Sequence, residues 1–151
     1  MLDEIRLIEE LAMRAWPAEI VDEVDGWKLR WHKMSSRRVN SVWPNAWGGK
    51  VPLALKLEKA EFFYAMRGQP TRYQICPAAL PVGLDEVLEA RGYTVDALTA
   101  VQVAEVAGVI QAAFARGARA EIQLFETLTE EWLEGYCLVQ EGNLKSLESR
   151  S

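Results

Sequence analysis

The sequence predicts an α/β protein with a mixed, mostly antiparallel sheet flanked by helices, opening with a helix and then a β-hairpin. Three observations predict this class. Apolar residues recur at helical spacing over residues 2–16. The turn signal Asp25-Gly26 separates two strand-like segments, 20–24 and 27–32. Strand and helix patterns then alternate over residues 37–94. Helices mixed with short strands are typical of a sheet covered by helices.

The opening helix and hairpin follow from local patterns. Pro17 ends the helix, because the residue before a proline avoids the helical conformation. The second hairpin strand alternates cleanly between apolar and polar residues. We expect its apolar residues on one face and its polar residues outward on the other; these are Trp27, Leu29 and Trp31, and Lys28, Arg30 and His32.

The middle of the chain reads strand, loop, helix, strand, helix. A strand over 38–42 is ended by Trp43-Pro44. Pro52 suits the first turn of a helix that runs to about residue 66, and Gly68 suits its end. A short strand is expected over 72–75. A short helix is expected over 84–91, capped by Gly92.

The last third of the sequence predicts an extended region, one strand and two helices. An extended region begins at Tyr93, and a helix is expected over about 109–116. A strand is expected over 120–125. Thr127 and Glu130 have the spacing of a capping box, so we expect a helix to begin at Thr127.

The composition is that of an ordinary globular protein. Half of the 151 residues are apolar and 26% are charged, which suits one domain, or one domain plus a fragment. A net charge of -5 argues against binding to nucleic acid. No segment approaches the about 18 apolar residues of a membrane span, and the acidic start M-L-D-E-I-R is unlike a signal peptide. We therefore expect a cytoplasmic protein that binds neither nucleic acid nor a membrane.

The cysteine and histidine content argues against a metal site. Cys76 and Cys137 are far apart and the sequence contains one histidine, so neither a zinc site nor another metal site is expected. Two buried thiols in a reducing cytosol are the favoured interpretation of the cysteines, with a disulfide left open.

Four segments carry a resemblance to a known family. They are D-G-W-K-L-R-W (25–31), R-R-V-N-S-V-W-P (37–44), F-F-Y-A-M-R-G-Q-P-T-R-Y-Q-I (62–75) and L-E-A-R-G-Y (88–93). They resemble the N-terminal half of certain bacterial N-acetyltransferases of the GCN5-related (GNAT) superfamily. The resemblance covers roughly 4–94, with a weaker echo over 121–136.

The resemblance implies a division of the chain. In that family the N-terminal half is a degraded copy of the acetyltransferase fold, and a complete catalytic domain follows it. Residues 1–106 would then be a degenerate GNAT-like domain. Residues 107–144 would be a connecting helix with the first strand and helix of a second, truncated domain, and 145–151 a frayed tail.

The resemblance also implies acetyl-CoA as cosubstrate and acetyl transfer to a primary amine by direct attack. In the family two parallel strands splay apart, and the pantetheine pairs with the first of them. Glycine amides at the next helix N-terminus bind the pyrophosphate. The corresponding elements here are the strand 38–42, the helix after Pro52 and the strand 72–75. The family's R/Q-x-x-G-x-G/A loop is absent from this sequence.

The candidate cofactor-binding residues are Gly48, Gly49 and Lys50, since two adjacent amides and a cation can hold one phosphate. A turn that enters a helix is the simpler interpretation. Trp43 and Trp47 flank this loop and can line a pocket for a small-molecule ligand, although such residues more often cover a core. Asn40 can bind a ligand amide or tie down the neighbouring loop.

No catalytic residue is assigned. Amine acetylation needs a base and a proton donor, and the polar candidates are Glu58, Glu61, Tyr64 and Tyr73. None stands in a motif that marks catalysis, so each is more typical of a surface or a core.

Three functional hypotheses remain. The first is a GNAT-superfamily acetyltransferase-like protein. The second is a non-catalytic binding or dimerisation module derived from an acetyltransferase, forming a homodimer by exchange of the strand 120–125 and its following helix. The third is a small-molecule sensor that uses the tryptophan-lined cleft.

Overall fold

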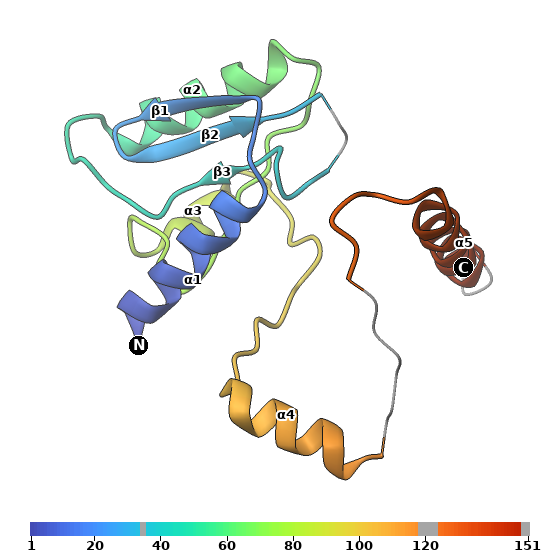
Figure 1. The fold of residues 1–151 in the computed structure, drawn as a ribbon. Helices are drawn as coiled ribbons and strands as arrows, with labels where there is room; N and C mark the ends of the chain where they lie inside the picture. Colours follow the sequence, from blue (N-terminus) through green and yellow to red (C-terminus); the bar gives the residue numbers. More distant parts are fainter. Residues whose placement is uncertain (34–35, 118–123, 149–151) are drawn as a thin grey trace. The chain divides into compact units, whose positions relative to one another are not determined.

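The computed structural model describes residues 1–33, 36–117 and 124–148 (Figure 1). The chain divides into two compact units, Met1–Leu98 and Thr99–Ser151. The predicted class is confirmed, because helices accompany a three-stranded antiparallel sheet and the chain opens with a helix and a hairpin. Among the described residues, no helix combines the length and apolar character needed to cross a membrane.

The first unit is built on the predicted helix and hairpin. Helix α1 spans Leu2–Ala15, and strands β1 and β2 span Ile20–Val24 and Trp27–Trp31. Val24 lies opposite Trp27, so the hairpin is closed by the two-residue turn Asp25-Gly26. Both turn residues have positive φ, 49° and 94°, which aspartate and glycine tolerate.

The third strand is shorter than predicted. Strand β3 covers only Val42–Trp43, antiparallel to β2, and residues 37–41 form turns and a bend instead of the expected strand 38–42. Local hydrogen bonds explain the difference: Asn40 N–H donates to the Ser36 carbonyl (3.1 Å), and the Ser41 hydroxyl donates to the Arg38 carbonyl (3.0 Å). Such contacts compete with a strand ladder.

The expected strand 72–75 is reduced to a single parallel bridge between Tyr73 and Val42. Val42 N–H donates to the Arg72 carbonyl (2.8 Å), and Gln74 N–H donates to the Val42 carbonyl (2.9 Å). The chain therefore passes from β3 through a loop and a helix to a parallel neighbour of β3.

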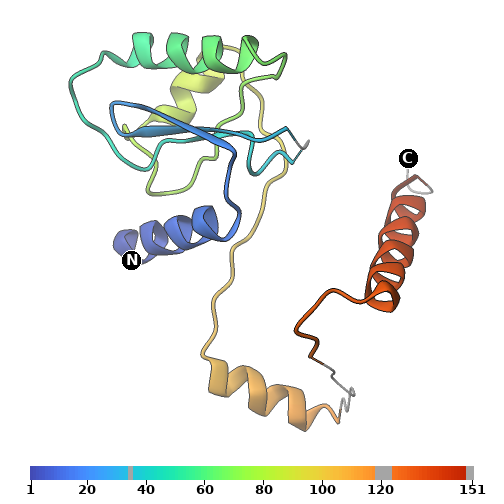
Figure 2. The same ribbon diagram turned by 45° about the horizontal axis from the view of Figure 1, so that its top comes forward.

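Two predicted helices cover one face of the sheet. Helices α2 and α3 span Leu53–Ala65 and Leu84–Ala90, and Gly92 follows α3 with positive φ. Figure 2 shows α1 and α2 on opposite sides of the sheet. The core lies on the α2 side; its buried members are Trp27, Leu29, Val42, Leu57, Ala60, Phe63, Tyr64, Leu84 and Leu88.

Arg30 was expected to face outward, and this prediction is wrong. The residue is 1% exposed, because α1 covers that face of the sheet. Its guanidinium donates to the carbonyl oxygens of Met13 (3.2 Å) and Trp16, at the end of α1. The last carbonyls of a helix have no partner within the helix, so the buried arginine satisfies two of them. Burial lowers the pKa of Arg30.

The second unit contains two helices, α4 (Val106–Ala115) and α5 (Glu130–Glu148). Helix α4 confirms the helix predicted near 109–116. Helix α5 begins later than predicted: Thr129, not Thr127, caps it, because Thr129 Oγ1 accepts from Trp132 N–H (3.2 Å). Residues 93–105 form no strand. Most of the predicted strand 120–125 lies outside the described residues.

Two further differences concern the tail and the cysteines. Helix α5 includes residues 145–148, the first part of the expected tail. Both cysteines are free, but Cys137 is exposed and Cys76 only half-buried, so the expectation of two buried thiols is wrong.

Candidate functional site

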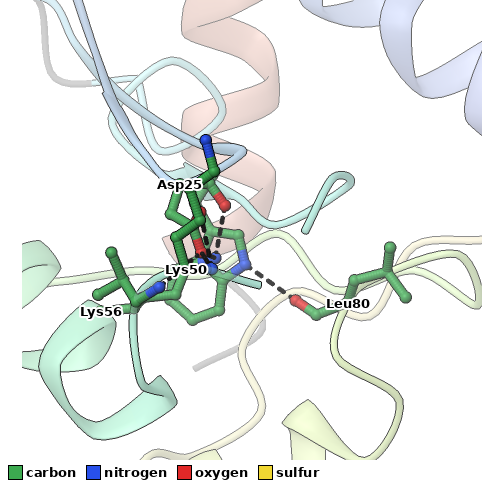
Figure 3. Close-up of polar contacts among 6 residues, drawn as sticks. Asp25, Lys50, Lys56 and Leu80 are labelled. Carbon is green, nitrogen blue, oxygen red and sulfur yellow. Dashed lines mark hydrogen bonds and ion pairs between the residues drawn. The ribbon is translucent and has the colours of Figure 1, made fainter. Parts of the chain in front are cut away.

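The candidate phosphate loop lies against the hairpin turn (Figure 3). Gly48 N–H donates to the backbone carbonyl of Asp25 (2.9 Å). At the other side of the turn, a Cβ on Gly26 would lie 2.8 Å from the carbonyl carbon and oxygen of Ala46. The two segments therefore pack backbone to backbone, and only glycine permits this approach.

The Asp25 carboxylate occupies the amides of Lys50 and Val51, next to the Gly48 and Gly49 amides that were expected to hold a phosphate. Lys50 N–H lies 3.3 Å and 3.2 Å from its two oxygens, and Val51 N–H donates to Oδ2 at 3.2 Å. The Asp25 side chain is 5% exposed. A Cβ on Gly48 would lie 2.0 Å from Asp25 Oδ1, so the loop needs glycine there. Of the three predicted residues, Lys50 binds the Asp25 carboxylate through its backbone amide, and Gly48 binds the Asp25 backbone carbonyl. Gly49 between them has a positive φ of 72°. The anion at this loop therefore belongs to the chain itself.

The cation at this site is Lys56. Its side chain is fully buried, and Nζ donates to the Asp25 carbonyl (2.8 Å) and pairs with Oδ2 (3.5 Å). Nζ also lies 3.7 Å from the ring centroid of Trp47 and 4.6 Å from that of Trp27. Aromatic faces attract a cation, so a carboxylate and two indoles enclose the ammonium.

Sequence reasoning missed Lys56, although one signal was present. Lys56 falls on the buried stripe of α2, three residues after Leu53 and four before Ala60. A lysine at a core position of a helix needs a buried partner. Asp25, at a turn 31 residues earlier, is that partner.

Burial, hydrogen bonds and the charges of the pair together shift the pKa values of Asp25 and Lys56. Burial alone would raise the pKa of Asp25, but hydrogen bonds from Val51 and Lys50 and the charge of Lys56 outweigh it and lower the pKa. Burial lowers the pKa of Lys56, and the Asp25 carboxylate opposes part of that decrease. The carboxylate is therefore ionised at neutral pH and acts as the anion of the loop.

The two predicted tryptophans do not lie in one cluster. Trp47 packs beside Lys56 and Trp27, with 6.2 Å between the indole centroids. Trp43 is buried below the Arg30 guanidinium, 5.1 Å from its Cζ. Val42 belongs to the core on the α2 side, so its strand neighbour Trp43 faces the α1 side.

Asn40 is buried and its side chain binds the backbone after β2. It is 2% exposed, and its Oδ1 accepts from His32 N–H at 2.7 Å.

Of the four polar candidates for catalysis, Tyr64 and Glu61 have hydrogen-bond partners within the fold. Burial raises the pKa of Tyr64 and of Tyr73, which makes each hydroxyl a poor proton donor. The Glu61 carboxylate accepts from the Arg91 guanidinium at 2.8 Å and 2.9 Å, and this pairing lowers its pKa. Glu58 is exposed. A carboxylate held in an ion pair is a weak base.

An open groove of about 700 Å³ lies between β1 and α2. Its walls include Asp22, Glu23, Leu55, Glu58, Phe62 and Met66. It contains none of the residues of the candidate phosphate loop. Among the described residues, no group of His, Cys, Asp and Glu side chains could hold a metal ion.

Comparison with known proteins supports an acetyltransferase-like relationship for part of the chain. It is 38% identical over 87 residues to the uncharacterized N-acetyltransferase YobR of Bacillus subtilis (strain 168). The matched region is 58% of this chain and 34% of that protein, so the chain spans about a third of the length of this curated relative. No family model and no solved structure matches the chain.

Proposed function

We propose that the chain belongs to an acetyl-CoA-dependent N-acetyltransferase of the GCN5-related type, and that residues 1–98 form a non-catalytic module of it. The partial similarity to a protein named N-acetyltransferase supports the membership in such an enzyme. The order of β3, loop, α2 and a parallel neighbour at Tyr73 agrees with the arrangement that the resemblance implies.

The contact of Asp25 with the loop supports the assignment of residues 1–98 as a non-catalytic module. The amides of Lys50 and Val51 already hold its carboxylate. A pyrophosphate at this place would have to displace an anion that is covalently part of the chain and paired with Lys56. Pro52 contributes no N–H to the start of α2, so fewer donors remain for a second anion.

The backbone of β3 is also used within the chain. A pantetheine arm would pair with the free edge of this strand. Here Val42 exchanges two hydrogen bonds with Arg72 and Gln74, and the Pro44 carbonyl accepts from Leu80 N–H at 2.6 Å. The polar groups that an acyl-CoA would need are satisfied without it.

Isothermal titration of the full chain with acetyl-CoA tests this function. We expect no heat of binding and no thermal stabilisation at millimolar acetyl-CoA, while a catalytically complete N-acetyltransferase in the same buffer binds. Binding at micromolar affinity, or acetyl transfer to a primary amine, would contradict the non-catalytic assignment and favour an enzyme.

Dimerisation is the second candidate role, and helix α4 favours it. Within the second unit none of its residues is buried, and Val106 and Phe114 are 71% and 80% exposed. An apolar helix of this kind needs a covering surface, which a second copy of the chain can supply by exchanging residues 120–136. Light scattering at micromolar concentration should then report a dimer; a monomer alone would count against this role.

A further inference from the structure

We propose that Lys50, Val51 and Lys56 form a binding site for a small carboxylate, which the Asp25 side chain fills as an intramolecular ligand. The loop amides and the buried ammonium are the receptor, and the hairpin turn delivers the anion. These contacts exist whether or not the chain takes part in acetyl transfer.

The donors converge on one point from separate elements. Two successive backbone amides, at 3.2 Å each, bind Asp25 from the loop before α2. The Lys56 ammonium reaches the same carboxylate from the first turns of α2, with 3.5 Å between Nζ and Oδ2. Successive amides directed at one anion form a backbone nest, and the ammonium supplies the full charge.

The site keeps its demand for an anion when the Asp25 side chain is removed. Lys56 is completely buried, and a buried ammonium without a counter-ion is costly. Trp47 and Trp27 offer only the negative faces of their rings, at 3.7 Å and 4.6 Å. An external anion of the right size would therefore gain an ion pair with Lys56 and hydrogen bonds from the Lys50 and Val51 amides.

The shape of the site selects acetate. Exchanging Asp25 for glycine removes a methylene and a carboxylate, which together have nearly the size of acetate. The space left would be bounded by Gly48, because a Cβ built there lies 2.0 Å from the Asp25 Oδ1 that an acetate oxygen would replace. Asp25 has a φ of 49°, a conformation that glycine adopts freely. The Asp25→Gly variant thus opens the site without straining the turn.

Thermal unfolding of full-length Asp25→Gly, in sodium acetate against sodium chloride at equal ionic strength, tests this site. We expect acetate to raise the unfolding midpoint by several degrees in a saturable manner. NMR should show the Lys50 and Val51 amide resonances shifting with the same apparent affinity. The wild type and Asp25→Asn, whose side chains still fill the site, should show no response beyond that to chloride.

The matched control is Lys56→Met in the Asp25→Gly background, which should abolish the acetate response. Equal responses to acetate and chloride, or stabilisation by phosphate alone, would overturn the assignment. If Asp25→Gly is unfolded in chloride, acetate should restore its folded signal. Should it fail to do so, amide hydrogen exchange in the wild type decides: the Lys50 and Val51 amides must be protected, and exchange at the rate of a free loop would overturn the site.

Discussion

The Tyr64 hydroxyl is hydrogen-bonded to both backbone groups of Arg30. It accepts from the Arg30 N–H at 3.1 Å and donates to the Arg30 carbonyl at 2.8 Å. Tyr64 comes from α2 and Arg30 from the central strand β2, so one buried side chain links the helix layer to the sheet. Tyr64, one of the candidate catalytic residues, therefore has a structural role in joining α2 to the sheet.

Tyr64→Phe should destabilise the protein by about 1–3 kcal/mol, because the buried Arg30 carbonyl loses its partner. Urea unfolding followed by tryptophan fluorescence measures the change. Tyr93→Phe is the matched control, since its half-buried hydroxyl donates to the accessible Glu61 carboxylate, which water can reach in its place, and it should cost less. Equal stability of Tyr64→Phe and wild type would show that the link carries no net energy.

Lys56→Met should reduce the free energy of unfolding by about 1.5–3 kcal/mol, the range for hydrogen bonds of charged groups. The substitution keeps the apolar stem but leaves the Asp25 anion without its cation. Lys59→Met, on the exposed face of the same helix, should change little. Combining Lys56→Met with Asp25→Asn should cost less than the sum of the two single changes, since the residues form one unit. Strict additivity would argue against coupling.

Gly48→Ala and Gly49→Ala separate steric exclusion from backbone strain. Gly48 has no positive φ, but its Cβ would meet Asp25 Oδ1 at 2.0 Å. Gly49 has a φ of 72° and room for a Cβ, so alanine there should cost about 1–2 kcal/mol from strain alone. Gly48→Ala should cost more, because it must expel the carboxylate. The order of the two urea midpoints checks this, and the reverse order would contradict the packing of the loop on Asp25.

Stability should fall in acid through the Asp25 carboxylate. Its pKa is lower in the folded protein than in the unfolded chain, so its stabilising contribution is complete above the ordinary aspartate pKa of about 3.9. The contribution is lost as the pH falls from there through the folded pKa. Urea midpoints measured across this range should decline less steeply for Asp25→Asn than for the wild type. Parallel curves would mean that Asp25 does not contribute.

Much of the first unit could be predicted from neighbouring residues. The apolar spacing before Pro17, the Asp25-Gly26 turn and the stripe of α2 are local patterns, and each predicted its element correctly. The length of β3 was not predictable in this way, because the Ser41 hydroxyl competes for the backbone. Thr127 and Thr129 both suit a helix cap, and only the hydrogen bond from Trp132 distinguishes them.

The identity of the anion at residues 48–51 depended on the tertiary structure. Periodicity and turn chemistry place helices and hairpins because they act between residues a few positions apart. The pairing of Asp25 with Val51 and Lys56 joins positions 26 and 31 residues apart, and no pattern along the chain encodes that distance. Arg30 shows the same limit: its strand alternation indicated an outward side chain, and α1 buried it by covering that face of the sheet.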